Sequence, residues 1–162
     1  MINRRRAQFA GFTLIELVIT VAIVGLLASA ALPLASMAIR REKESDLRAA
    51  LQQIRGAIDA YKAAAARGRV QVPADKTGYP ATLQLLYEGV EDVSNPQKTR
   101  IYFLRRLPRD PLYPDASAPA ADSWGLRSYA SSPEAPEPGE DVFDVYSLAK
   151  GKGLNGVDYH DW

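Results

Sequence analysis

One carboxylate stands inside a long apolar segment near the amino terminus. Glu16 lies five residues beyond Gly11 and four beyond Phe12, and no charged side chain occurs in the stretch 17–39 that follows it. An ionisable group at the centre of a membrane segment costs roughly 2.5–3.5 kcal/mol on insertion scales, so such a group usually has a partner. The chemistry expected of Glu16 is therefore the neutralisation of a positive charge.

The apolar segment is long enough to cross a membrane. Its 23 uncharged residues exceed the number that a helix needs to span the hydrocarbon layer, and three arginines, Arg4 to Arg6, precede it. An ordinary secretory signal has an apolar core of about 7 to 15 residues, so this segment is too long for one. An uncleaved anchor with the arginines in the cytoplasm would explain the length and the orientation. It would leave Glu16 without a role.

The residues around Gly11 resemble the class III leader of type IV pilins and type II secretion pseudopilins. A basic stretch ends in Gly11–Phe12, Glu16 follows at the family's spacing, and Pro33 lies within the apolar run. The resemblance implies that residues 1–11 are a leader, which a prepilin peptidase removes by cutting after Gly11, and that Phe12 is then N-methylated. It also implies that Glu16 and Pro33 serve filament assembly.

The leader cleavage gives Glu16 a partner. Removal of residues 1–11 would leave a charged amine on Phe12 at the end of an apolar helix. In a low dielectric, pairing that amine with Glu16 of a neighbouring subunit is strongly favoured over leaving either charge alone. The resemblance implies that this pair sets the axial register of a growing filament.

Helical periodicity continues beyond the apolar segment. An apolar stripe recurs at steps of four, three, four and three residues, formed by Leu47, Leu51, Ile54, Ile58 and Tyr61. Gly68 is a predicted stop, so we expect one helix over residues 13–67, weakened at Gly25 and Pro33. Residues 12–39 would form its transmembrane and filament-core part, and residues 40–68 an amphipathic part that packs on a small domain.

Residues 69–162 have the composition of that small domain. Ten of the eleven prolines lie here. The patterns predict a short helix over 82–87 and strands within 123–132 and 141–149. The segments that resemble pseudopilins, most closely the major pseudopilins of type II secretion, are YP (79–80), LRRLPRDP (104–111), WG (124–125), DVYSL (144–148) and the final tryptophan. The expected fold class is α+β and type IV pilin-like: a long amino-terminal helix packed on a small antiparallel β-sheet.

The carboxyl-terminal tail departs from the family's acidic loop, which binds calcium. By resemblance and by oxygen chemistry, the candidate calcium ligands are Ser147, Asn155, Asp158 and Asp161. Calcium takes six to eight oxygen ligands, and Lys150 and Lys152 bring positive charge where acidic residues would be expected. A calcium site and a loop held by glycine turns and the packing of Trp162 both stay open.

The sequence offers little for catalysis or nucleic-acid binding. It has no cysteine, and its one histidine, His160, is close to the carboxyl terminus. It contains no Gly-x-Ser-x-Gly, phosphate loop or histidine-based zinc spacing, so no catalytic residue is predicted. Without Arg4 to Arg6, 17 basic residues face 19 acidic ones, and nucleic acid is not an expected partner.

The expected function is that of a noncatalytic pseudopilus subunit of type II secretion, which polymerises from the inner membrane to support protein secretion. Its implied partners are other copies of itself, other pseudopilins, the prepilin peptidase, an inner-membrane assembly platform with its ATPase, and membrane lipid. The chain would cross the inner membrane once, with its carboxyl-terminal domain in the periplasm. One alternative is a major or minor type IV pilin, which the absence of a cysteine-closed loop disfavours. Another is a membrane-anchored periplasmic enzyme or binding module.

Overall fold

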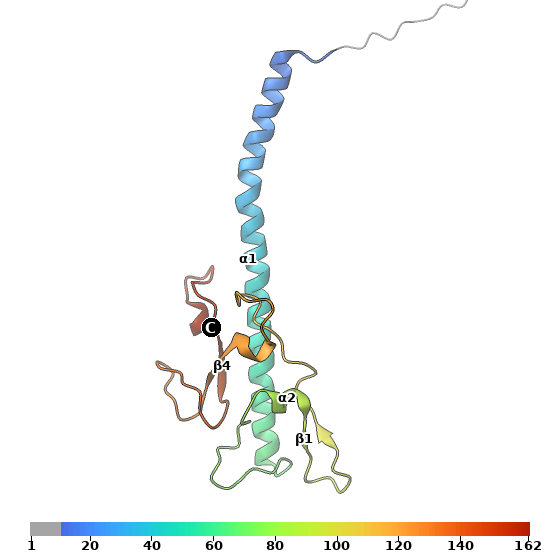
Figure 1. The fold of residues 1–162 in the computed structure, drawn as a ribbon, viewed down its shortest axis with the longest axis vertical. Coiled ribbons are helices and arrows are strands. Elements are labelled where there is room, and N and C mark those ends of the chain that lie inside the picture. Colours follow the sequence, from blue (N-terminus) through green and yellow to red (C-terminus); the bar gives the residue numbers. More distant parts are fainter. Residues whose placement is uncertain (1–10) are drawn as a thin grey trace, which may run out of the picture. The chain divides into compact units, whose positions relative to one another are not determined.

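The computed structural model describes residues 11–162, apart from the side chains of Ala30 and Leu32 (Figure 1). The predicted leader arginines, Arg4 to Arg6, lie outside the described residues. One compact unit ends at Arg40 and a second comprises Arg41–Trp162. The elements in chain order are α1 (Leu14–Ala66), α2 (Gln84–Glu88), β1 (Val90–Glu91), β2 (Arg100–Ile101), the 3-10 helix η1 (Ala120–Ser123), β3 (Trp124–Arg127), β4 (Asp144–Ser147) and the 3-10 helix η2 (Tyr159–Asp161). The predicted α+β, pilin-like fold class is confirmed.

Helix α1 follows the predicted range of 13–67 closely and continues through Gly25 and Pro33. Three of its hydroxyl side chains donate hydrogen bonds to backbone carbonyls three residues earlier in the helix. Ser36 bonds to Pro33 at 2.8 Å, Thr20 to Leu17 at 2.9 Å and Ser29 to Leu26 at 2.7 Å. These bonds satisfy the hydroxyl donors without water, which suits a segment built for apolar surroundings.

The predicted stop at Gly68 is confirmed by its backbone geometry. Gly68 has φ of 69°, in the left-handed region that glycine enters without steric cost. Its N–H donates to the carbonyl of Ala65 at 2.9 Å, and the N–H of Arg69 donates to the carbonyl of Ala64 at 3.0 Å. These two bonds form a Schellman motif, which satisfies carbonyls at the end of α1 and turns the chain back toward the core.

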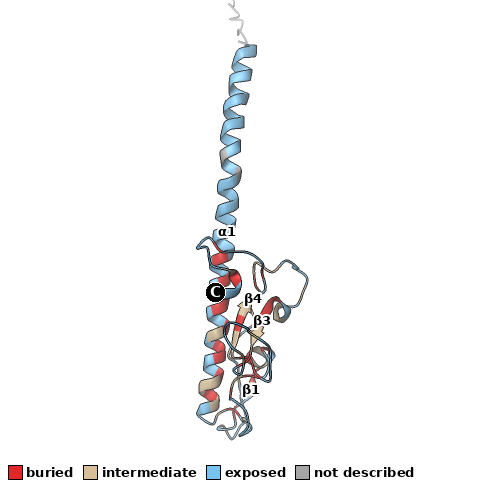
Figure 2. Ribbon diagram, turned by 90° about the vertical axis from the view of Figure 1, so that its left-hand side faces the viewer, coloured by how far each residue is buried: buried red, intermediate tan, exposed pale blue. Residues whose placement is uncertain are grey.

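The core of the second unit forms around the predicted stripe of α1. All five stripe residues are buried, and Figure 2 shows that the buried positions of α1 occur in its part after Arg40. The stripe packs in one cluster with Leu86 of α2, Trp124 of β3, Val145 of β4 and Tyr159 of η2. Helix α1 thus supplies one wall of the core, and the short elements supply the other.

The strands form two antiparallel pairs rather than one sheet. Strand β3 pairs with β4, with Trp124 opposite Ser147 and Gly125 opposite Tyr146. A side chain at Gly125 would collide with the ring of Tyr146, so glycine is needed there. Strands β1 and β2 are two residues each and were not predicted, and α2 begins two residues later than expected. Both predicted strand regions contain an observed strand.

Candidate functional site

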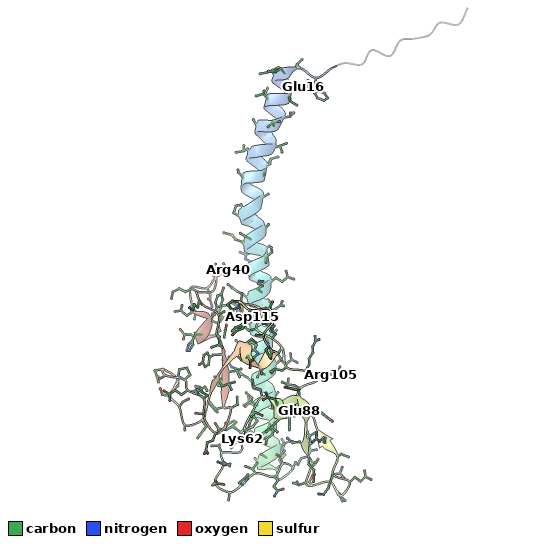
Figure 3. All side chains as sticks on the ribbon, viewed as in Figure 1. Glu16, Arg40, Lys62, Glu88, Arg105 and Asp115 are labelled. Atoms are coloured by element: carbon green, nitrogen blue, oxygen red, sulfur yellow. The ribbon has the colours of Figure 1, made fainter. Side chains whose placement is uncertain are left out.

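The predicted processing and assembly residues lie at the start of α1. Gly11, Phe12 and Thr13 precede the helix, and Figure 3 shows Glu16 in its first turn. The backbone N–H of Glu16 donates to Thr13 Oγ1 at 3.3 Å, and the N–H of Leu17 donates to the Thr13 carbonyl at 3.1 Å. Thr13 is therefore the N-cap of α1, in a Thr-x-x-Glu capping arrangement. This role was not predicted from the sequence, although the Thr-x-x-Glu spacing signals it.

The cap leaves the Glu16 carboxylate available for other contacts, because the bond uses its backbone N–H. A negative charge in the first helical turn also interacts favourably with the helix dipole. The structure places Gly11 and Phe12 just before α1 and Glu16 in its first turn, whereas Pro33 lies about 26 Å further along α1 at 1.5 Å per residue. Pro33 and Glu16 therefore lie at different levels of the helix.

The first unit exposes its apolar side chains. Phe12 is 82% exposed, and each described side chain from residue 11 to residue 40 is exposed. By length and composition, α1 can cross a membrane. An apolar surface this long is unfavourable in water, so a lipid phase or other protein chains must cover it.

The predicted calcium ligands are engaged in separate contacts. Ser147 is buried, and its Oγ donates to Asp110 Oδ2 at 2.6 Å and accepts from the N–H of Ala149 at 3.1 Å. The carboxylate of Asp158 contacts the ammonium of Lys152 at 2.9 Å. Two further contacts involve Asn155 Oδ1, which accepts from the N–H of Val157 at 3.1 Å, and Asp161 Oδ1, which lies 3.1 Å from His160 Nδ1.

Together these donors do not fit a calcium site. Ser147 and Asp158 line one hollow of about 340 Å³, but Lys150 lines it too. In residues 11–162, no group of three or more histidine, cysteine or acidic side chains is placed to hold a metal. Calcium requires six to eight oxygens, and the carboxylate nearest to such a role is paired with a lysine.

The buried carboxylates of the second unit, among them Asp110 and Glu44, were not predicted from the sequence. Asp110 is 1% exposed; its Oδ1 accepts from the N–H of Leu112 at 2.7 Å, and its N–H donates to Ser123 Oγ at 3.1 Å. Glu44 is 2% exposed and accepts bonds from the carboxyl-terminal loop. A signal for Glu44 existed, because it precedes Leu47 by three residues and so continues the apolar stripe of α1.

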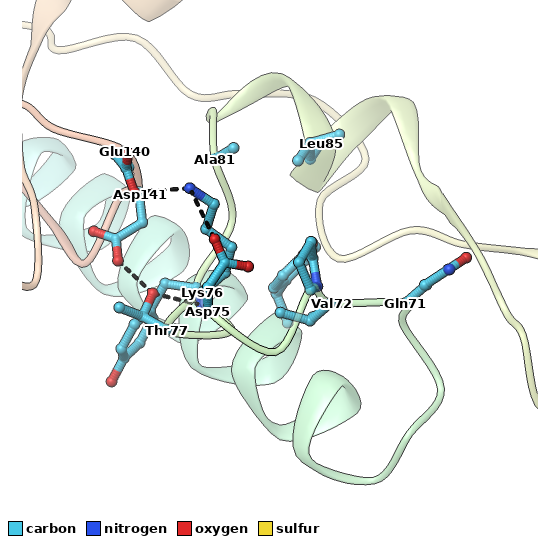
Figure 4. A pocket seen from close by; sticks show the side chains of 12 residues that line it. Gln71, Val72, Asp75, Lys76, Thr77, Ala81, Leu85, Glu140 and Asp141 are labelled. Atoms are coloured by element: carbon cyan, nitrogen blue, oxygen red, sulfur yellow. Dashed lines mark hydrogen bonds and ion pairs between the residues drawn. The ribbon is translucent and has the colours of Figure 1, made fainter.

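A cavity of about 240 Å³ lies beside the end of α1 (Figure 4). Tyr61, Val72 and Leu85 contribute apolar lining. Lys76 Nζ contacts Glu140 Oε2 at 2.8 Å on its polar side, and this hydrogen bond raises the pKa of Lys76. Burial raises the pKa of the Tyr61 phenol, which stays neutral at physiological pH. The residues that line the cavity include no histidine or cysteine, and the hydroxyl of Thr77 among them donates a hydrogen bond to Asp141 Oδ2.

Comparison with known proteins agrees with this geometry. Residues 6–32 match the prokaryotic N-terminal methylation motif. With a long apolar amino-terminal helix and small antiparallel strand pairs, this motif defines a pilin-like protein.

Two related proteins show to which family of pilin-like proteins the chain belongs. The chain is 29% identical to type II secretion system core protein G of Pseudomonas aeruginosa, over 98% of each chain. It is 31% identical to the protein of the same name from Klebsiella michiganensis, over 85% of this chain and 92% of the relative. The chain therefore belongs to the core protein G family of type II secretion pseudopilins, as its residues predicted. No solved structure matches it with comparable significance.

Proposed function

We propose that this protein is a structural, noncatalytic subunit of the type II secretion pseudopilus, which polymerises from the inner membrane and supports protein secretion. The observation that carries the proposal is the part of α1 up to Arg40, an exposed apolar helix whose one carboxylate, Glu16, lies within the methylation motif matched by residues 6–32. Exposure of this apolar surface to water makes an isolated monomer unfavourable. Lipid, or a bundle of like helices, would cover the surface and is favourable. The similarity to core protein G supports the type II secretion system as the place where that bundle forms.

Leader processing is the first step. The bond between Gly11 and Phe12 precedes the first turn of α1, so a prepilin peptidase can bind it as an extended segment without unwinding the helix. Cleavage creates the amine of Phe12, which is then N-methylated. The leader arginines hold the amino terminus in the cytoplasm, and residues 41–162 lie in the periplasm.

Assembly follows from charge pairing at the start of α1. As a subunit leaves the membrane, its apolar helix packs against those of other copies and of other pseudopilins. The amine of Phe12 and the carboxylate of Glu16 on a neighbour then meet in a low dielectric, where their attraction is strong and an unpaired charge is costly. Extraction is driven by the inner-membrane platform and its ATPase. Pro33, whose nitrogen cannot donate a hydrogen bond, provides a point where α1 bends during packing.

The test changes Glu16 and leaves the cap intact. Glu16→Ala and Glu16→Gln should still insert into the membrane but should fail to form filaments and to secrete. Glu42→Gln, an exposed carboxylate of the same helix, is the matched control and should behave like the parent. Sheared-filament yield and secreted protein are measured together, and mass spectrometry checks for a chain that begins at N-methylated Phe12. Normal filaments from both Glu16 variants would contradict the proposal.

A further inference from the structure

We propose that the carboxyl-terminal loop, residues 150–162, is organised by the buried carboxylate of Glu44 on α1, which takes the place of a bound calcium ion. The fold and the secretion role of this subunit would then be independent of calcium. The resemblance to the family implies a calcium loop, but the donors of this chain do not form one. The loop nevertheless contacts one buried carboxyl group, that of Glu44.

Glu44 joins two separate points of the loop to α1. Its Oε1 accepts a hydrogen bond from the backbone N–H of Leu154 at 2.9 Å and another from the phenol of Tyr159 at 2.9 Å. Hydrogen bonds to an ionised acceptor are roughly twice as strong as neutral ones. Because Glu44 is almost fully buried, loss of its contacts would leave unsatisfied polar groups in the core.

The loop is shaped around this centre as a small hairpin. The N–H of Gly153 donates to the carbonyl of Val157 at 2.7 Å, and the N–H of Tyr159 donates to that of Gly151 at 3.1 Å. Lys152 and Asp158 stand opposite each other in this antiparallel bridge and form the ion pair described above. The pair gives the Asp158 carboxylate a cation from within the chain, so calcium would have to displace Lys152.

Trp162 closes the loop against the same face of α1. The Arg48 guanidinium lies 4.2 Å from the centroid of the Trp162 ring, and its Nη2 is 4.0 Å from Glu44 Oε2. The rings of Tyr159 and Trp162 meet edge to face at 5.2 Å. A side chain at Gly153 would collide with the Trp162 ring. Residues 44 and 48, one turn apart on α1, therefore hold the two aromatic anchors of the loop.

The experiment uses the full chain in detergent and measures thermal unfolding and trypsin cleavage after Lys150 and Lys152. The parent should give the same unfolding midpoint and the same cleavage rate in millimolar calcium and in chelator. Glu44→Gln should lower the midpoint and speed cleavage in the loop by roughly tenfold, because the charged acceptor is lost. Tyr159→Phe removes only a hydroxyl and should speed cleavage in the same direction by less. Glu42→Gln is the control and should cleave like the parent.

Two results would overturn the proposal. One is a calcium-dependent rise of the parent's midpoint that Asp158→Asn abolishes, which would establish a metal site. The other is loop cleavage at the parent's rate in both Glu44→Gln and Tyr159→Phe, which would show that the loop is held without Glu44. Secretion that continues in chelator, in cells that carry the parent protein, is the corresponding outcome expected in vivo.

Discussion

The two parts of helix α1 share one geometry and differ in what covers them. In the part up to Arg40, each described side chain is exposed, and apolar residues occupy all faces. After Arg40, the large apolar residues form one buried stripe, which Glu44 continues, and the other charged residues of the helix lie outside it. Apolar content alone therefore does not decide burial within this chain. An apolar stripe can be buried by other segments of the same subunit, whereas a helix that is apolar on all faces requires lipid or neighbouring subunits.

The charges of the two parts differ in the same way. The apolar part has Glu16 as its one acid, exposed at the first turn. The amphipathic part has charges with partners inside its own unit, such as Arg55, whose Nε contacts Asp144 Oδ1 at 2.7 Å, and the buried Glu44. We expect the first kind of charge to matter for assembly and the second kind for the stability of the subunit.

The largest effect should come from a matched isoleucine pair. Ile54 is 0% exposed and Ile23 is 53% exposed. Ile54→Ala should lower the free energy of unfolding of the second unit by about 2–5 kcal/mol, since it removes buried methyl groups and leaves a cavity. Ile23→Ala should leave that free energy unchanged. Denaturant unfolding of the full chain in detergent measures both, and equal losses would contradict the division of α1.

A carboxylate pair gives the next effect. Asp110→Ala should lower the free energy of unfolding by about 1–3 kcal/mol, because Ser147 Oγ and the N–H of Leu112 lose a buried acceptor. Glu16→Ala should leave unfolding of the second unit unchanged while abolishing assembly. Asp122, which is exposed, provides the control as Asp122→Ala. Parent-like stability of Asp110→Ala would show that the hydrogen bonds to Asp110 do not stabilise the second unit.

Three glycines in and after α1 also distinguish its two parts. Gly68→Ala should destabilise the second unit by about 1–2 kcal/mol because its φ is positive. Gly56 is exposed within the helix with open space around it, so Gly56→Ala should stabilise by about 0.5–1 kcal/mol. Gly25→Ala in the apolar part should not change this unit. The same unfolding assay applies, and stabilisation by Gly68→Ala would contradict the predicted stop.

The smallest effect concerns pH. The hydrogen bond from Arg69, reinforced by Ser94, lowers the pKa of Asp92 below its ordinary value of 3.8. Because the folded pKa is the lower one, this stabilisation is fully present above pH 3.8 and is lost as the pH falls through the folded value. Unfolding followed from pH 6 down to pH 2 should therefore show a shallower acid loss in Asp92→Asn than in the parent. An identical acid slope would mean that Asp92 titrates alike in both states.

Much of the fold could be predicted because its signals are local. The helix bounds, the stop at Gly68 and the apolar stripe follow from spacing along a single element, and the positions of β3 and β4 follow from strand composition. The methylation motif is likewise a contiguous pattern. The Thr13 cap was equally local and was overlooked.

What the sequence by itself determined is therefore the long helix, its division into an all-round apolar part and a striped part, and the family. Only the tertiary structure decided which polar groups became buried partners. Glu44 meets Leu154 across 110 residues, and Asp110 meets Ser147 across 37. Spacing alone does not place Asp158 beside Lys152; the antiparallel bridge of residues 152 and 158 brings the two side chains to 2.9 Å.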